Sequence, residues 1–302
     1  MKIDFFFQYL LSGLTRGSIY ALIALGYTMV YGIVKLINFA HGEIYMIGAF
    51  TALIVSGVLG MYGVDPVVTF MIAITAAVIY SAAYGVTLEK IAYKPLRKAP
   101  RLSALISAIG MSMFLQNYVL LAQTSDFLPF PELIPEFEFL DPIKSILSTN
   151  QFLILVTTAV VMVLLTILIK FTRTGKAMRA TAQDRDMAQL VGININKVIS
   201  ITFVIGSATA AIGGVLISSQ IGQINFYIGF IVGIKAFVAA VLGGIGSIPG
   251  AVLGSFVLGI TESFGTGYIS SDYEDAFAFI ILIVILIFKP SGLLGRKTTE
   301  KV

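Results

Sequence analysis

The stretch TRTGKAMRATAQDRDMAQLVGININ, residues 172–196, is a polar segment in a chain that otherwise consists largely of apolar runs. Thr174 and Asp184 are residue types that begin helices, and Gly192 is of the type that follows a helix end. The pattern predicts two short amphipathic helices that meet at Asp184 and carry small apolar faces. Such a helix pair, placed between two long apolar runs, indicates a surface that contacts a partner in water.

The rest of the composition is that of a membrane protein. Of the 302 residues, 57% are hydrophobic and 12% are charged, whereas a soluble domain carries roughly twice that charged fraction. Several apolar runs reach the length of about 20 residues that a helix needs to cross the hydrocarbon core. Because these runs are continuously apolar instead of alternating, a membrane β-barrel is excluded. The chain is therefore predicted to be an all-α polytopic membrane protein.

The apolar runs predict about eight or nine transmembrane helices in a single transmembrane domain over residues 1–302. The predicted spans are 9–34, 37–58, 67–92, 103–122, 150–170, 198–219 and 275–289, with two shorter apolar pieces at 230–247 and 249–262. A Gly/Pro break separates the two pieces. One broken span, a re-entrant hairpin and two separate spans all remain open for this pair.

The placement of Lys and Arg predicts the orientation of the chain. Three segments hold 15 of the 20 basic residues, namely 90–101, 170–197 and 289–301. Cytoplasmic loops carry such an excess, whereas the connections at 123–149 and 263–274 have one basic residue between them, Lys144. We therefore expect the 172–196 helices in the cytoplasm and the 123–149 loop outside. Counting spans then places the N-terminus outside and the C-terminus in the cytoplasm.

Several classes of chemistry find no support in the sequence. The chain has no cysteine and one histidine, which removes disulfides and thiolate metal sites and argues against a transition-metal site. It has no GxxxxGK[ST] nucleotide loop, no nucleophile elbow and no HExxH helix. The chain is predicted not to be an enzyme, and to hold no cofactor, metal or nucleic acid of its own.

The most polar segment within the predicted spans is KLINFAHGE, residues 35–43. A carboxamide, an imidazole and a carboxylate are costly there unless they face water, a partner or a substrate path. Asn38 and His41 are expected on one helix face, with Glu43 pointing elsewhere unless Gly42 breaks the helix. A polar path or hinge is one interpretation, and satisfied helix ends are the other. A proton relay through His41 and Glu43 is a further alternative.

A second candidate is the glycine-rich stretch AAVLGGIGSIPGAVLGSFVLG, residues 239–259. A break at Gly244, Gly246 and Pro249 survives in a membrane only where protein or a water-filled cavity satisfies the freed backbone groups. Close helix packing and a translocation path both explain such residues. Arg16 and Lys235, which lie elsewhere in the spans, are expected to snorkel to the interface.

Three motifs carry a resemblance to a known family: GSIYALIALGYTMVYGIVKLINFAHGEIYMIGAF (17–50), TRTGKAMRATAQDRDMAQLVGIN (172–194) and LGGIGSIPGAVLGSFVLG (242–259). Together they resemble the membrane-spanning permease subunit of bacterial branched-chain amino-acid ABC importers, and most of all its shorter, LivH-type form. The resemblance implies the ribose/vitamin-B12 type of permease fold in the bacterial inner membrane. It also implies a second permease subunit as heterodimer partner, two cytoplasmic ATPase subunits that bind ATP and Mg, and a periplasmic binding protein.

The resemblance also assigns roles to residues. The 172–196 helices would be the coupling element that docks on the ATPases, through Gly175, Lys176, Arg179, Ala180, Asp184, Ala188 and Gly192. The translocation path would involve Asn38, His41, Glu43, Gly244, Gly246 and Pro249, and the 123–149 loop would be periplasmic.

Other functions remain open at this point. Relatives of such permeases carry urea, short amides or other amino acids in place of branched-chain amino acids. An ion-coupled secondary carrier and a non-transporting membrane scaffold are alternatives of other classes, and neither needs a partner ATPase.

Overall fold

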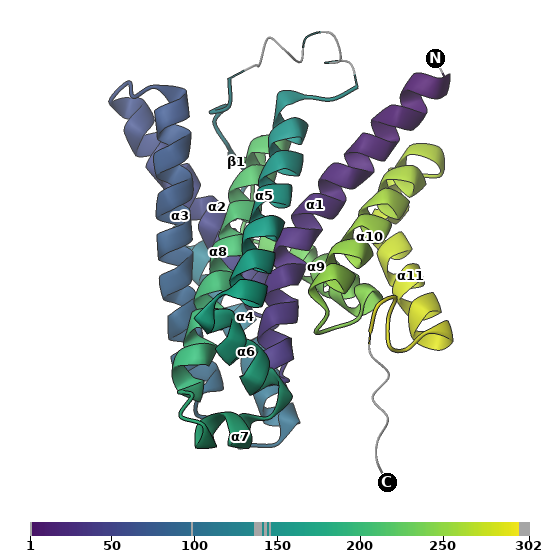
Figure 1. Cartoon of the computed structure of the whole chain (residues 1–302). Coiled ribbons are helices and arrows are strands. Elements are labelled where there is room, and N and C mark those ends of the chain that lie inside the picture. The colour runs from purple at the N-terminus through teal and green to yellow at the C-terminus, as the bar shows by residue number, and fades with distance from the viewer. Residues whose placement is uncertain (1, 98, 136–140, 142–143, 145, 296–302) are drawn as a thin grey trace.

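The computed structural model describes residues 2–97, 99–135, 141, 144 and 146–295, and these form an almost entirely helical structure (Figure 1). The long helices are α1 (Lys2–Val34), α2 (His41–Met61), α3 (Pro66–Leu88), α4 (Arg101–Ala122), α5 (Thr149–Phe171), α8 (Ile195–Ile221) and α10 (Ile248–Tyr268). The shorter helices are α6 (Arg173–Gln183), α7 (Arg185–Leu190), α9 (Ile228–Gly243) and α11 (Glu274–Phe288). A π-helical turn, Glu89–Tyr93, extends α3, and a 3-10 turn, Ser271–Tyr273, precedes α11.

Seven helices of the described chain are long and apolar enough to cross a membrane, which confirms the predicted polytopic all-α fold. The predicted total of eight or nine also counted the pieces that form α9 and α11, which have 16 and 15 residues. At 1.5 Å per residue such helices reach about 24 Å, less than the hydrocarbon core of about 30 Å. Both are therefore partial spans.

The Gly/Pro-broken pair is a partial helix followed by a full one. The second piece was predicted to end at residue 262, where a carboxylate follows an apolar run, but α10 continues to Tyr268. The prediction of that end was wrong because Glu262 is fully buried inside the protein and does not mark the membrane surface.

Close crossings between helices hold the bundle together. α1 packs along α10, where a Cβ added at Gly259 would lie 2.3 Å from the main-chain nitrogen of Gly17. On the other side α2 packs against α8, and a Cβ at Gly214 would lie 2.4 Å from the carbonyl oxygen of Tyr45. Small residues permit this backbone approach, which is a main source of helix association in lipid.

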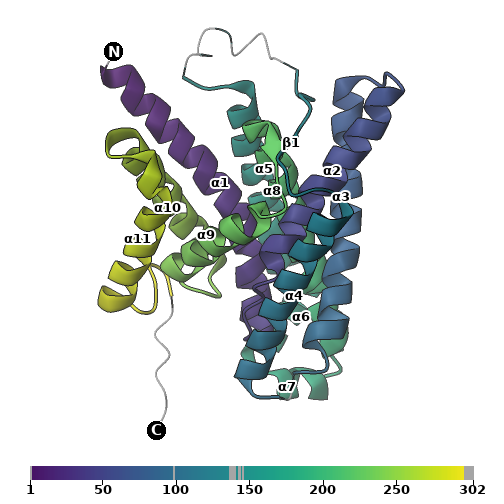
Figure 2. The same ribbon diagram turned by 180° about the vertical axis from the view of Figure 1, so that it is seen from behind.

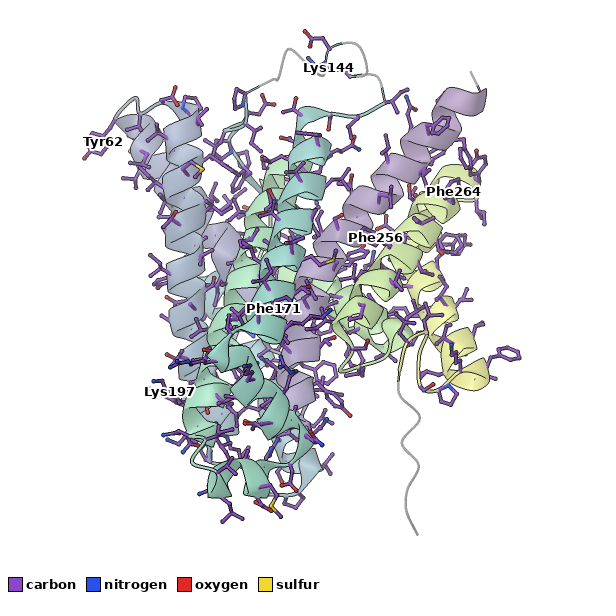
Figure 3. The ribbon with its side chains drawn as sticks, in the orientation of Figure 1. Tyr62, Lys144, Phe171, Lys197, Phe256 and Phe264 are labelled. Carbon is purple, nitrogen blue, oxygen red and sulfur yellow. The ribbon has the colours of Figure 1, made fainter. Side chains whose placement is uncertain are left out.

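The two ends of the molecule differ in character. The start of α1 and the described part of the 123–148 connection lie at one end, and α6 and α7 lie at the other (Figures 1 and 2). Figure 3 shows Lys144 at the first end and Lys197 toward the second. This separation matches the prediction that the two connections lie on opposite sides of a membrane. Which side is cytoplasmic, and with it the orientation of both termini, stays a prediction.

The 123–149 loop is tied to the bundle in its first half. There β1 (Leu128–Pro129) pairs antiparallel with β2 (Gln223–Ile224), and the Phe130 amide donates to the Gly222 carbonyl at 2.9 Å. Phe130 and Leu133 are buried. The remainder of this predicted loop falls partly on 136–140, 142, 143 and 145, which lie outside the described residues.

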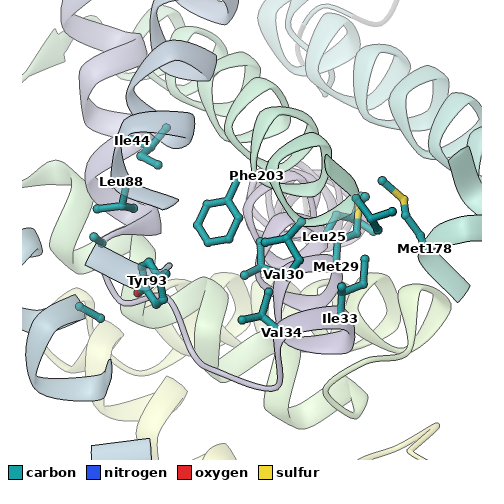
Figure 4. Close-up of a cluster of buried hydrophobic side chains, with 14 of the residues drawn as sticks. Leu25, Met29, Val30, Ile33, Val34, Ile44, Leu88, Tyr93, Met178 and Phe203 are labelled. Atoms are coloured by element: carbon teal, nitrogen blue, oxygen red, sulfur yellow. The ribbon is translucent and has the colours of Figure 1, made fainter. Parts of the chain in front are cut away.

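One buried apolar cluster joins the α6–α7 end to the spans. Figure 4 shows Met178 of α6 beside Met29 and Ile33 of α1, with Phe203 of α8 and Tyr93 close by. The rings of Tyr93 and Phe203 lie 5.5 Å apart. Met178 therefore packs α6 into the core of the bundle.

Candidate functional site

The α6–α7 pair begins and ends at capping residues. The Thr172 hydroxyl accepts a hydrogen bond from the Gly175 amide at 3.0 Å, and the Asp184 carboxylate accepts one from the Met187 amide at 3.0 Å. The predicted cap Thr174 was wrong, since it lies inside the first turn of α6. Asp184 is confirmed as the cap of α7. Gly192 follows α7 with a φ of +86°, a conformation that side chains disfavour.

The seven predicted coupling residues do not share one environment. Gly175 and Ala188 are buried, and a Cβ at Gly175 would lie 2.2 Å from the carbonyl oxygen of Leu168 at the end of α5. Lys176, Arg179, Asp184 and Gly192 are exposed, and Ala180 is half-buried. Gly175 thus sets how closely α6 packs on α5, while Lys176, Arg179 and Asp184 expose their side chains.

Exposed apolar side chains gather at the tip of α7. Met187, Leu190 and Val191 are 61%, 79% and 75% exposed. They lie outside the spans, on a segment whose other exposed residues are polar, so lipid does not explain them. Exposed apolar side chains rimmed by polar residues mark protein contact sites.

Two arginines of this pair bind the ends of spanning helices. Arg179 donates to the carbonyl of Ile169 in the last turn of α5. Arg185 donates to the carbonyl of Ile33 in the last turn of α1, from Nε at 3.2 Å and from Nη2 at 2.6 Å. Burial lowers the pKa of the Arg185 guanidinium, and nearby Arg97 lowers it further, but a guanidinium stays charged. Sequence reasoning did not single out Arg185, because nothing near it in the chain indicates a partner 152 positions away.

A second group of polar contacts joins α3 to α8 at the same end. Arg97 forms a salt bridge with the buried Glu89 and also donates to Asn196 at the start of α8. The Ser200 hydroxyl donates to the other Glu89 oxygen at 3.0 Å. At this end of the molecule, side-chain contacts therefore connect α6 to α5, α7 to α1, and the end of α3 to α8.

The predicted path residues Asn38, His41 and Glu43 contact three different parts of the bundle. Asn38 accepts a hydrogen bond from the Tyr93 hydroxyl at 2.8 Å, and it precedes α2, which begins at His41. The expected shared helix face of Asn38 and His41 is therefore wrong, because Asn38 is not helical. His41 packs on the α1 backbone at Gly26 and lies edge-on to Tyr27, with ring centroids 5.0 Å apart.

Glu43 lies deepest of the three and is fully buried. One of its oxygens, Oε1, accepts hydrogen bonds from the Ser112 hydroxyl and the Gln116 amide of α4, each at 2.9 Å. The other, Oε2, has no hydrogen-bond partner and faces the start of α9 at Gly229. Among the described contacts none joins His41 to Glu43, so the geometry offers no direct proton relay between them.

The second predicted path segment runs from the tight turn after α9, which contains Gly244 and Gly246, into the first turn of α10, where Pro249 lies. Gly244 and Gly246 have φ values of +103° and +94°, and the Ser247 hydroxyl caps α10 by accepting from the Gly250 amide at 3.2 Å. Gly246 approaches Gly32 of α1, almost two helical turns from the Gly26 contact of His41. The structure therefore does not bring the two groups of predicted path residues together.

A network of charged side chains around the buried Lys235 and Glu262 was missed by the sequence reading. Lys235 of α9 lies 3.4 Å from Glu262, 2.9 Å from Glu274 and 2.8 Å from Asp275, and Arg16 lies 2.9 Å from Glu274. The expectation that Lys235 snorkels to the interface was wrong, because Lys235 is buried and meets acidic partners from α10 and α11. The side chain of Arg16 is 34% exposed beside Glu274, and the expectation for it stays a prediction. Within the part of the chain that the structure describes, no group of three His, Asp or Glu side chains could hold a metal ion.

Comparison with known proteins agrees with this architecture. The model of the family described as "Branched-chain amino acid transport system / permease component" matches residues 9–286. The chain is 52% identical to the high-affinity branched-chain amino acid transport system permease protein BraD of Pseudomonas aeruginosa, over 100% of this chain and 99% of that protein. It is 48% identical to the high-affinity branched-chain amino acid transport system permease protein LivH of Escherichia coli K12, over 99% of this chain and 98% of that protein.

A solved structure shares the fold. PsaBC from Streptococcus pneumoniae, in complex with a Fab, matches 96% of this chain and 97% of its own with a TM-score of 0.50 at 16% identity. Full-length matches of about half identity and a family model that covers nearly the whole chain establish the family. The chain belongs to the permease components of branched-chain amino acid transport systems, which are membrane-spanning subunits of ABC importers and not enzymes.

Proposed function

We propose that this chain forms, together with a second permease chain, the transmembrane path of an ATP-driven importer for branched-chain amino acids. The observation that carries the proposal is the match over essentially the whole length to permeases named for that transport. ABC importers of this family work with ATPase and binding-protein partners in general. The heterodimeric pairing and two ATPase subunits for this particular chain are part of the proposal.

The orientation follows from the charges. The 90–101 and 170–197 segments, with 11 of the 20 basic residues, lie at one end of the bundle, where Arg97 contacts Asn196. Because cytoplasmic loops carry such an excess, this end faces the cytoplasm and the 123–149 loop faces the periplasm. The α6–α7 pair then lies where ATPase subunits are.

The tip of α7 is the docking surface for an ATPase subunit. Met187, Leu190 and Val191 offer the apolar contact, and the exposed Lys176 and Asp184 lie at its rim. Arg185 and Met178 connect this surface to α1, so a movement of the ATPase reaches the span that precedes Asn38, His41 and Glu43. Alternating access then results from a tilt of these helices about their small-residue crossings.

Reconstitution tests the transport function. The purified importer, with both permease chains and the ATPases, is placed in proteoliposomes together with the binding protein, and uptake of labelled leucine is measured. We expect uptake that requires both ATP and the loaded binding protein. Uptake of urea or a short amide without uptake of leucine would correct the substrate. Uptake driven by a proton or sodium gradient without the ATPases would identify a secondary carrier instead, and no uptake under either condition would favour a scaffold.

A matched pair of variants tests the docking surface. Leu190→Asp places a charge in the proposed contact, and we expect ATPase stimulation and uptake to fall by about tenfold or more. Tyr62→Asp makes a comparable change at a side chain that is 81% exposed at the opposite end of the molecule (Figure 3), and should leave both unchanged. Equal ATPase stimulation and equal uptake in the two variants would show that α7 is not the docking surface.

A further inference from the structure

Three glutamates are buried in the described part of the chain, namely Glu43, Glu89 and Glu262, each at most 1% exposed. Glu89 is paired with Arg97, and Glu262 lies 3.4 Å from Lys235 and accepts a hydrogen bond from the Tyr20 hydroxyl at 2.6 Å. No such cation meets Glu43 among the described residues. A carboxylate removed from water is costly unless a charged partner compensates it. Glu43 is therefore the buried acid whose partner the fold does not itself supply.

The contacts of Glu43 leave one oxygen free. Oε1 is held by two neutral donors, Ser112 and Gln116 of α4, which orient the carboxylate without neutralising it. Oε2 is buried and has no hydrogen-bond partner. Oriented by its neighbours and open at one oxygen, this group is suited to accept a cationic hydrogen-bond donor.

The surroundings of Oε2 are shaped by glycine and by the start of a half-length helix. A Cβ at Gly229 would lie 2.6 Å from Oε2, and a Cβ at Gly42 would lie 2.3 Å from the Gly229 carbonyl oxygen, so only glycine permits the crossing of α2 and α9. α9 begins here, and its N-cap Tyr227 makes no side-chain cap bond. The first amide of α9, that of Ile228, donates to the Asn225 carbonyl at 3.3 Å, and the remaining amides of the first turn favour anionic groups.

Aromatic rings lie further along α9, about two helical turns beyond Gly229. Tyr27 and Phe39 both lie against Phe237 of α9, with ring centroids 6.1 and 5.4 Å apart. A carboxylate, an uncapped helix start and an aromatic cluster together match the three parts of an apolar amino acid: its ammonium group, its carboxylate and its side chain.

We propose that Glu43, oriented by Ser112 and Gln116, is the subsite in the transmembrane path that receives the ammonium group of a transported amino acid. This rests on the proposed transport function. Glu43 is fully buried, so the subsite is closed in the present conformation.

The central experiment compares charge and shape at position 43 in the reconstituted importer. Glu43→Gln keeps the size and the oxygen that accepts from Ser112 but removes the charge, and leucine uptake should fall about ten- to a hundredfold. Glu43→Asp keeps the charge and should retain more uptake than Glu43→Gln. Glu132→Gln makes the same chemical change at an exposed loop residue and should leave uptake unchanged.

A second readout reports the charge itself. The chain has no cysteine, so Gln116→Cys introduces a single thiol beside Glu43. During turnover, a cationic methanethiosulfonate should label Cys at position 116 several-fold faster than an anionic one, as measured by mass spectrometry of this chain. The preference should disappear in the Glu43→Gln background, and leucine-loaded binding protein should slow the labelling.

The outcomes separate this inference from the proposed function. Wild-type importer that takes up no leucine would overturn the transport function and the subsite with it. Leucine uptake by the wild type together with full uptake by Glu43→Gln would overturn the subsite alone. Glu43 would then have a structural role beside the start of α9. Equal loss of uptake and thermal stability in Glu43→Gln and Glu43→Asp, with no charge preference in labelling, would assign Glu43 to the packing of α2 on α4, and would also overturn it.

Discussion

Arg185 in α7 and Ile33 in α1 are joined by two hydrogen bonds from one guanidinium to one main-chain carbonyl, at 3.2 and 2.6 Å. The carbonyl belongs to the last turn of α1, whose final carbonyls have no partner within the helix. The negative end of the helix dipole also attracts a cation at this position. The contact makes the proposed ATPase-coupling helix a cap of the span that leads into the Asn38–Glu43 segment.

Replacing Arg185 should therefore uncouple ATP hydrolysis from transport. In Arg185→Lys the single ammonium cannot reproduce the two-pronged contact, and we expect leucine uptake per ATP hydrolysed to fall about three- to tenfold while the importer still assembles. Uptake and ATPase activity are measured together in proteoliposomes. Arg173→Lys, at an exposed position of α6, is the control and should keep the wild-type ratio. An unchanged ratio in Arg185→Lys would show that the contact does not transmit movement.

Gly175 should tolerate no side chain. A Cβ there would lie 2.2 Å from the Leu168 carbonyl and 2.3 Å from that of Ile169, so Gly175→Ala should push α6 away from α5 and destabilise the protein by about 1–3 kcal/mol. Gly110→Ala is the matched control in a spanning helix, because a Cβ at Gly110 meets nothing within 4 Å. That control should be neutral or stabilising by up to about 1 kcal/mol. Thermal unfolding in detergent measures both, and equal midpoints would contradict the close contact.

The N-cap of α6 can be tested with two neighbouring threonines. Thr172→Ala removes the hydroxyl that accepts from the Gly175 amide and should cost about 1 kcal/mol locally. Thr174→Ala lies inside the first turn and should cost less. Hydrogen exchange of the first α6 amides reports the difference, with faster exchange expected in Thr172→Ala. The opposite ranking would restore Thr174 as the cap.

The stability of the protein should depend on whether Lys235 and Glu262 keep both charges or lose only one of them. Lys235→Met leaves the fully buried Glu262 without its cation, and breaking a buried pair on one side costs about 3–5 kcal/mol. The double variant Lys235→Met/Glu262→Gln removes both charges and should recover much of that loss. Thermal unfolding of the two variants checks this. A double variant as unstable as the single one would show that the loss comes from the Glu274 and Asp275 contacts of Lys235 instead.

Particular residues show where reading the sequence succeeded and where it did not. The ends of α5, α7 and α8 were predicted to within a few residues, since they lie where apolar runs meet charges, caps or glycine. The interpretation of Lys235 failed, because a lone lysine in an apolar helix looks like a snorkelling side chain until α10 and α11 bring acidic partners. Glu43 was recognised as costly in a membrane, but its α4 partners lie 69 and 73 positions further along the chain.

The sequence by itself therefore determined that the chain is a multi-span helical membrane protein with a polar helix pair at one end. Span length and charge placement are local properties, and the bilayer imposes them on each segment separately. Only the tertiary structure decided what the polar side chains meet: Arg185 the main-chain carbonyl of Ile33, Lys235 the carboxylate of Glu262, and Glu43 the side chains of Ser112 and Gln116. These partners depend on which helices cross at their glycines, and that choice is made by close packing between segments far apart in the chain.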